Sequence, residues 1–87
     1  MIRKRRDRIQ IIEDILSAAE DPRGALKTHL VYRANLNFMR LEQYLTYLLE
    51  NELLEISAED DRYYLTSKGR NFITQVQETR SFLVAVP

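Results

Sequence analysis

Apolar residues recur at every third or fourth position in the first part of the chain, with polar residues between them. This spacing places the apolar side chains on one face of a helix, and the set is Ile9, Ile12, Ile15 or Leu16, and Ala19. Pro22 disfavours helical backbone at the residue before it, and Gly24 follows closely, so the helix should end near this point. The pattern therefore predicts an amphipathic helix over about residues 5–20.

Two further helices, joined by a short turn, are predicted next. The first of them runs from about Leu26 to Ala34. Asn35 can adopt the left-handed backbone conformation that ends a helix, and Asn37 is a favourable N-cap for the next helix, over about residues 37–51. Two helices separated by a three-residue turn have the spacing of a helix-turn-helix motif.

The third helix carries two stripes of side chains. Its apolar stripe, which should face the core, is Phe38, Leu41, Leu45, Leu48 and Leu49. A second stripe, at positions i, i+3, i+4 and i+7, is Arg40, Gln43, Tyr44 and Tyr47. Because this second stripe lies off the apolar face, we expect it to contact something other than the core; the alternative is a solvated helix face.

A β-hairpin and a last helix complete the predicted fold. Leu54–Ile56 and Tyr63–Leu65 have the alternation of half-buried strands around a polar tip, so they predict a pair of strands over residues 54–65. Thr66 is a suitable N-cap for a final helix over about residues 66–82. The chain is therefore expected to be mainly α with a small β-hairpin, in the order α-α-α-β-β-α.

Composition narrows the possible chemistry. The 87 residues suit a single domain over residues 1–87, and the absence of cysteine excludes disulfides, thiolate catalysis and cysteine-ligated metal sites. His29 is the only histidine and there are two glycines, which excludes multi-histidine metal sites and glycine-rich phosphate loops. No apolar run approaches the roughly 20 residues of a membrane span, and the N-terminus lacks the apolar core of a signal peptide. We expect a soluble, cytoplasmic, non-enzymatic domain without cofactor or metal.

The net charge of zero conceals a strong segregation of charge along the chain. Residues 1–12 carry five basic side chains and one acid, and residues 23–47 carry four basic side chains and one acid. Residues 13–22 and 48–62 are strongly acidic. Overall neutrality argues against a protein that coats DNA by charge alone, whereas the two basic blocks are compatible with one basic face.

Four segments resemble those of small archaeal winged helix-turn-helix regulators. Residues 33–38 (RANLNF) resemble the turn and the start of the recognition helix, and residues 41–54 (LEQYLTYLLENELL) resemble the run into the first wing strand. Residues 64–70 (YLTSKGR) resemble the end of the wing, and residues 5–9 (RRDRI) resemble the first helix. The resemblance implies a DNA-binding transcriptional regulator or chromatin protein that forms a homodimer through its C-terminal helix.

The last helix departs from the long antiparallel coiled coil of the related archaeal chromatin proteins, because about 17 residues span only about 25 Å. A compact helix–helix dimer is still compatible with the sequence. Its expected contact residues offer more apolar surface than one small domain readily covers, and they are Phe72, Ile73, Val76, Phe82 and Leu83. The alternative is that the C-terminal tail folds back over the first helix of its own chain.

In the fold implied by this resemblance, the third helix lies in the major groove and the second crosses the phosphate backbone. Arginine can pair with guanine and glutamine with adenine, whereas basic and hydroxyl side chains reach phosphates. The candidate base-reading residues are Asn37, Arg40, Gln43 and Tyr44. The candidate backbone contacts are Lys27, Thr28, Arg33, Tyr47, Arg5 and Arg6. The partners are thus expected to be double-stranded DNA and a second copy of the chain, with no membrane and no small-molecule ligand.

The predicted wing favours a different class of function. Its tip carries Glu59, Asp60 and Asp61, which DNA would repel, and Arg62 is the only basic residue there. The chain could therefore be a winged-helix module that binds protein and not DNA. A salt-dependent mobility shift with mixed duplex DNA would distinguish between the two functions.

Overall fold

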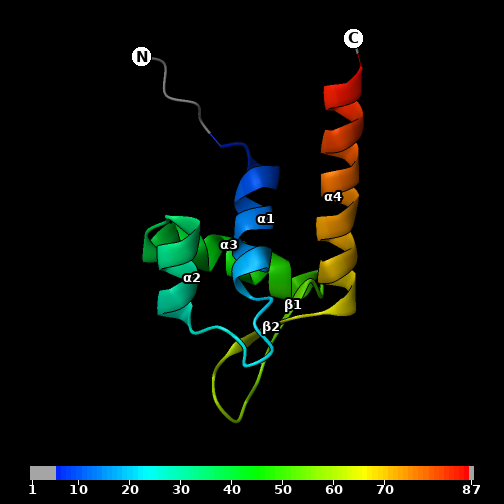
Figure 1. Ribbon diagram of the computed structural model, residues 1–87. Helices are drawn as coiled ribbons and strands as arrows, with labels where there is room; N and C mark the ends of the chain where they lie inside the picture. Colours follow the sequence, from blue (N-terminus) through cyan, green and yellow to red (C-terminus); the bar gives the residue numbers. More distant parts are fainter. Residues whose placement is uncertain (1–5, 87) are drawn as a thin grey trace.

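A computed structural model describes residues 6–86 of the chain. The elements follow one another in the predicted order (Figure 1): α1 (Arg8–Ala18), α2 (Lys27–Ala34), α3 (Phe38–Glu50), β1 (Leu54–Ile56), β2 (Tyr63–Leu65) and α4 (Ser67–Ala85). The expected mainly helical fold with a small hairpin is thus confirmed. Compared with the predicted ranges, α1 is shorter at both ends and α4 continues three residues further.

The hydrophobic core lies where α1, α2 and α3 meet, closed by the hairpin and the first half of α4. Its largest fully buried side chains, each worth about 1.5–3 kcal/mol through burial, are Ile15, Leu16, Leu30, Leu41, Leu45, Leu48 and Leu54. No polar or charged side chain is buried among residues 6–86. The prediction that Ile9 and Phe38 belong to the core was wrong, since they are 49% and 50% exposed. Each lies in the first turn of its helix, at the periphery of the core.

The turn between α2 and α3 forms as its asparagines predict. Asn35 has φ 54° and ψ 52°, the left-handed conformation, and ends α2. The backbone N–H of Leu36 then donates to the carbonyl of Val31 at 3.1 Å. Asn37 begins α3 by accepting, through its side-chain oxygen, the backbone N–H of Arg40 at 2.8 Å. Two short polar side chains therefore fix the geometry of the helix-turn-helix.

The hairpin is antiparallel, with Leu54 opposite Leu65 and Ile56 opposite Tyr63. A third backbone segment also pairs with it, since the N–H and carbonyl of Ala25 exchange two hydrogen bonds of 2.8 Å with Tyr63. Gly24, with φ 77°, directs the chain from the end of α1 into this pairing. The sequence pattern did not predict this contact, which joins the base of the wing to the loop between α1 and α2.

The start of α4 is fastened to the end of α3. The Thr66 hydroxyl caps α4 by accepting the N–H of Gly69 at 2.9 Å, and it donates to the carbonyls of Glu52 and Leu53 at 2.6 and 3.0 Å. Gly69 packs so closely on this segment that a Cβ atom there would overlap the carbonyl oxygen of Leu53. The glycine is therefore required by close approach of the backbone and not by its dihedral angles.

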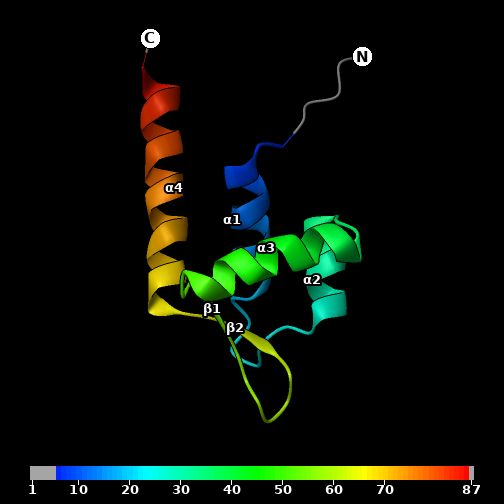
Figure 2. The ribbon, with the colours of Figure 1, turned by 180° about the vertical axis from the view of Figure 1, so that it is seen from behind.

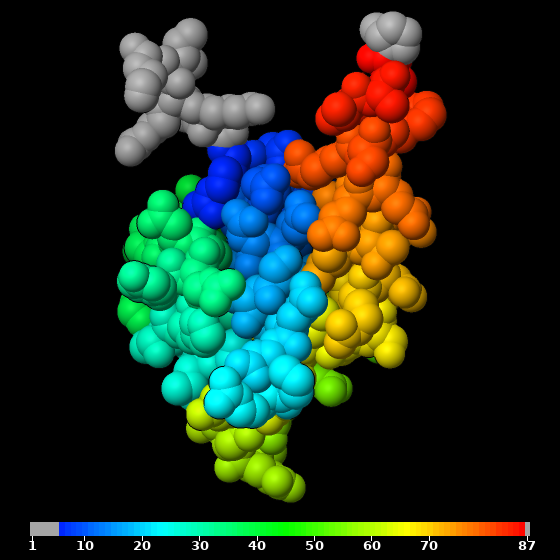
Figure 3. All heavy atoms as spheres, in the orientation of Figure 1, coloured from blue at the N-terminus to red at the C-terminus, as the bar shows by residue number. Residues whose placement is uncertain are grey.

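The molecule is elongated because α4 projects beyond the rest of it. The radius of gyration is 13.7 Å, compared with about 12 Å expected for a compact chain of this length. Figure 3 shows the last turns of α4 rising beyond the body, whereas Arg80 still lies 3.6 Å from Glu13 of α1. The tail does not fold back as a separate segment, because the helix continues to Ala85 and leaves Ile9 half exposed, but α4 lies along α1 and Leu83 borders the same groove as Ile9. Within residues 6–86, no helix is both long and apolar enough to cross a membrane.

Candidate nucleic-acid interface

Helix α3 lies across one face of the molecule, in front of α1 as seen in Figure 2. The burial of Leu41, Leu45 and Leu48 defines its inward face. At 3.6 residues per turn, the residues diametrically opposite are exposed, and they are Met39, Gln43, Thr46 and Glu50. The outermost ridge of α3 thus differs from the stripe that sequence reasoning selected, with Gln43 common to both.

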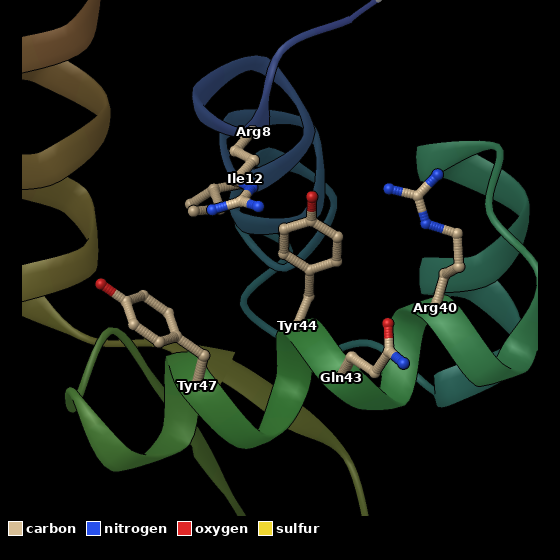
Figure 4. A pocket seen from close by; sticks show the side chains of 6 residues that line it. All are labelled: Arg8, Ile12, Arg40, Gln43, Tyr44 and Tyr47. Atoms are coloured by element: carbon tan, nitrogen blue, oxygen red, sulfur yellow. The ribbon is translucent and has the colours of Figure 1, made fainter.

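The predicted stripe is assembled as expected, but on the flank of α3 that faces α1. It borders an open groove of about 520 Å³ lined by Arg8, Ile12, Arg40, Gln43, Tyr44 and Tyr47. Figure 4 shows the Tyr44 ring directed from α3 toward α1, while the Arg40 and Tyr47 side chains flank it. Tyr44 is half-buried against the core, whereas Tyr47 is 54% exposed. The flank therefore combines aromatic surface with hydrogen-bond donors.

The groove has a basic character. Arg8 comes from the first turn of α1 and Arg40 from the first turn of α3, and both are exposed. Within residues 6–86 neither guanidinium has an ion-pair partner, and no carboxylate lines the groove. Guanidinium and phenol donors of this kind are suited to phosphate oxygens. Arg8 was missed as a site residue, although its position four residues before Ile12 on α1 could have indicated it.

Lys27, a predicted phosphate contact, is paired within the protein. Its ammonium donates to the carboxylate of Glu42 and links the first turn of α2 to α3. This hydrogen bond raises the pKa of Lys27 above its ordinary value. The charge that Lys27 could offer a phosphate is therefore balanced by Glu42. Thr28 and Arg33, the other predicted contacts on α2, are both exposed.

Arg6, also predicted to contact phosphates, serves the fold instead. Its guanidinium donates to the Asp14 carboxylate at 2.9 Å and to the carbonyls of Ala34 and Asn35 at 2.6 and 3.1 Å. These carbonyls lie at the C-terminal end of α2, where a cation satisfies unpaired backbone acceptors. The phosphate prediction for Arg6 is corrected accordingly, and Arg5 lies outside the described residues.

Asn37, a predicted base-reading residue, uses its side chain within the protein. Its side-chain oxygen accepts the N–H of Arg40 as the N-cap of α3. Recognition of adenine by asparagine needs that oxygen together with the amide nitrogen. The base-reading prediction for Asn37 is therefore corrected to a role in starting the helix.

The acidic tip of the wing is an ordered turn. The Asp60 carboxylate accepts the backbone N–H of Arg62 and the hydroxyl of Tyr64, both at 2.9 Å. The bond from the Arg62 N–H is the main reason why the pKa of Asp60 is lowered. Glu59 and Asp61 are exposed. Over the part of the chain that the structure describes, no three acidic or histidine side chains gather as metal ligands.

The predicted dimer residues of α4 divide into three groups by their burial. Ile73 is only 5% exposed and belongs to the core, so it leaves no surface for a partner, which corrects that part of the prediction. Phe72 and Val76 are half-buried and border a groove of about 300 Å³ between α4 and α1. Phe82 and Leu83 lie further along α4 and are 68% and 63% exposed.

Comparison with known proteins gives consistent matches. The family model described as winged helix-turn-helix matches residues 5–83. An uncharacterized protein of Methanocaldococcus jannaschii, MJ0290, is 38% identical over 74 residues, which is 85% of this chain but only 34% of that protein's length. A similar solved structure is that of Sso10a-2, a DNA-binding protein from Sulfolobus solfataricus, with a TM-score of 0.75 and 29% identity over 88% of this chain and 81% of the other. Both relatives are archaeal.

Proposed function

Because this chain belongs to the winged helix-turn-helix family, we propose that it binds double-stranded DNA in a sequence-specific manner and acts as a transcriptional regulator in the cytoplasm. The observation that carries the proposal is the exposed α3, bordered by a groove with two arginines that have no ion-pair partner within residues 6–86. The similarity to a DNA-binding protein of known structure supports the same function.

In the proposed complex, α3 enters the major groove with its N-terminal half toward the bases, as recognition helices of this type do. Arg8 and Arg40 then lie on one flank of α3, where they would contact phosphates of one strand. Arg40 and Tyr44, which the sequence was expected to place on base edges, are therefore proposed as backbone contacts. Tyr44 and Tyr47 line the same groove and would add hydroxyl donors. Thr28 and Arg33 on α2 would contact the backbone that the second helix crosses.

The test measures binding of a fluorescent 24-base-pair duplex of mixed sequence by anisotropy at several salt concentrations. Removing one phosphate contact should reduce the log–log salt slope by about 0.9. We expect this reduction for Arg8→Ala and for Arg40→Ala. The matched control is Arg23→Ala, which removes the same charge from a residue already paired with Asp21; its slope should stay unchanged.

A failure to bind any duplex at low salt would refute DNA binding. It would favour the alternative function, a winged-helix module that binds protein, for which the exposed carboxylates of Glu59 and Asp61 argue. The regulatory role has a separate test, in which transcription in vitro from promoters recovered by genomic footprinting is measured with and without the protein. Footprints that leave transcription unchanged would refute the regulatory role alone.

We further propose that the protein acts as a homodimer through the end of α4. Phe82, Leu83 and Val84 are 68%, 63% and 85% exposed, and burying each such side chain stabilises by about 1.5–3 kcal/mol. A second copy related by a twofold axis offers the same apolar surface. Sedimentation equilibrium at tens of micromolar should show a dimer for the full chain and a monomer for the double variant Phe82→Glu, Leu83→Glu. The control Gln77→Glu should stay dimeric, and a monomeric wild type would refute the proposal.

A further inference from the structure

The outermost ridge of α3 has an unusual composition for an exposed helix face. It consists of Met39, Gln43 and Thr46, spaced by four and three residues, and none of the three is charged. Met39 is 73% exposed, which places a flexible apolar side chain in water at the first turn of the helix. Glu50 continues the same face only in the last turn of α3, at the end opposite to the N-terminal residues that contact base edges in recognition helices.

Each of these side chains matches one group on an A·T base pair. A glutamine amide can pair with N6 and N7 of adenine, and apolar groups contact the C5 methyl of thymine. Thr46 donates its hydroxyl to the carbonyl of Glu42 at 3.1 Å, so the hydroxyl hydrogen is used within the helix and the methyl is left for an apolar contact. Methyl groups therefore lie one turn before and one turn after Gln43.

The one arginine of α3, which could read guanine, is displaced from this ridge. Arg40, which could pair with guanine, lies on the flank and lines the groove beside Arg8. The ridge consequently has no group of the kind that recognises a G·C pair bidentately.

We infer that the ridge formed by Met39, Gln43 and Thr46 selects A·T base pairs in the major groove, with Gln43 on adenine and the two flanking side chains on thymine methyl groups. The inference rests on the proposed DNA binding and adds the class of sequence recognised. It assigns base selection to this ridge and leaves Arg8 and Arg40 to the phosphates.

The experiment compares three 24-base-pair duplexes: alternating A·T, the same duplex with uracil replacing every thymine, and alternating G·C. Uracil differs from thymine only by the missing C5 methyl. Loss of one methyl contact should weaken binding by about fourfold, so the uracil duplex, which lacks both methyl contacts, should bind about 15-fold more weakly. Loss of the glutamine–adenine pair should weaken binding of the G·C duplex by a further factor of about 5 to 150.

Variants identify which side chains make these contacts. Met39→Ala and Thr46→Ser each remove apolar atoms, so each should reduce the preference for thymine over uracil. Thr74→Ser is the matched control, because Thr74 makes the same hydroxyl-to-carbonyl bond on α4, to Arg70 at 3.2 Å.

Gln43→Glu tests the contact with adenine. It exchanges donors for acceptors and should shift the preference from A·T toward C·G, since a carboxylate accepts from cytosine N4. Thermal unfolding confirms that each variant is folded.

The outcomes separate the two proposals. Equal affinity of the wild type for all three duplexes would overturn the inference and leave DNA binding intact. A thymine preference that persists unchanged in both Met39→Ala and Thr46→Ser would also overturn it, because the methyl groups would then be read by other residues. Binding of none of the duplexes at low salt would overturn DNA binding itself and the inference with it.

Discussion

Arg6 provides the sharpest distinction between a structural and a DNA-binding arginine. Its guanidinium joins the segment before α1 to Asp14 and to the carbonyls of Ala34 and Asn35, where α2 ends. Replacing Arg6 with alanine removes all three hydrogen bonds at once. We therefore expect Arg6→Ala to lower the stability of the fold and to leave the salt dependence of DNA binding unchanged.

The stability lost in Arg6→Ala depends on how far the Arg6 and Asp14 side chains are exposed to water. A hydrogen bond to a charged group contributes about 1.5–3 kcal/mol when it is shielded from water, but the Arg6 and Asp14 side chains are 31% and 30% exposed. Solvent screening reduces exposed ion pairs to about 0–1 kcal/mol. For the three bonds together we expect about 1–2 kcal/mol, which in a domain of this size lowers Tm by roughly 5–15 °C.

Thermal unfolding followed by circular dichroism measures the change, with Arg8→Ala as the matched control two residues away. Arg8 is exposed and has no ion pair within residues 6–86. Arg8→Ala should therefore change the free energy of unfolding by no more than about 0.5 kcal/mol, as neutral surface substitutions do, and leave Tm close to that of the wild type. Arg6→Ala should thus lower Tm and leave the salt slope of DNA binding unchanged, whereas Arg8→Ala should reduce the salt slope and leave Tm unchanged. An unchanged Tm for Arg6→Ala together with a reduced salt slope would refute the reasoning and return Arg6 to the phosphate contacts.

Three further predictions concern the fold. Gly69→Ala should destabilise by about 1–3 kcal/mol, measured by urea unfolding, because its Cβ would overlap the Leu53 carbonyl oxygen; equal or higher stability would contradict the close approach. Asn35→Ala should cost about 1 kcal/mol while Asn35→Gly is tolerated, since only the alanine is strained at φ 54°; equal unfolding midpoints would refute this. The hydrogen bond from Arg23 lowers the pKa of Asp21 to about 2, so its stabilisation is complete above pH 4 and is lost as pH falls toward 2. The Tm of Asp21→Asn should accordingly lie below that of the wild type at pH 5 and converge with it near pH 2.

The fold was predictable because its signals are local. The asparagines of the turn, the Thr66 cap and the helical spacing of leucines each act within a few residues, and all of them form as expected. The pairing of Ala25 with Tyr63 was not predictable, since it joins segments far apart in the sequence and uses backbone atoms alone. Side-chain pattern contains no information about such a contact.

The candidate interface was predictable only in part. The stripe containing Arg40 and Tyr44 does assemble, but it lies on a flank because the core face of α3 centres on Leu41, Leu45 and Leu48, with Phe38 outside it. The second stripe was selected by its i, i+3, i+4, i+7 spacing and not as the face opposite the buried leucines, so Met39 and Thr46 were overlooked. The pairing of Lys27 with Glu42 depends on how α2 crosses α3, and periodicity along one helix cannot determine that angle.

Because the first turn of α4 is fastened to the end of α3, a rotation at this junction would move the far end of α4. Thr66 and Gly69 hold the first turn of α4 against the carbonyl of Leu53, immediately beyond the last turn of α3. Nineteen helical residues extend about 28 Å from this pivot, so a rotation of about 5° there displaces the far end of α4 by roughly 2.5 Å. Beyond this pivot α4 is also held to α1, since Arg80 lies 3.6 Å from Glu13 and Ile73 belongs to the core. A tilt of α3 against a bound surface would therefore reach Phe82 and Leu83 only together with a shift of α4 against α1, and a partner that restrains the tip of α4 would oppose that shift.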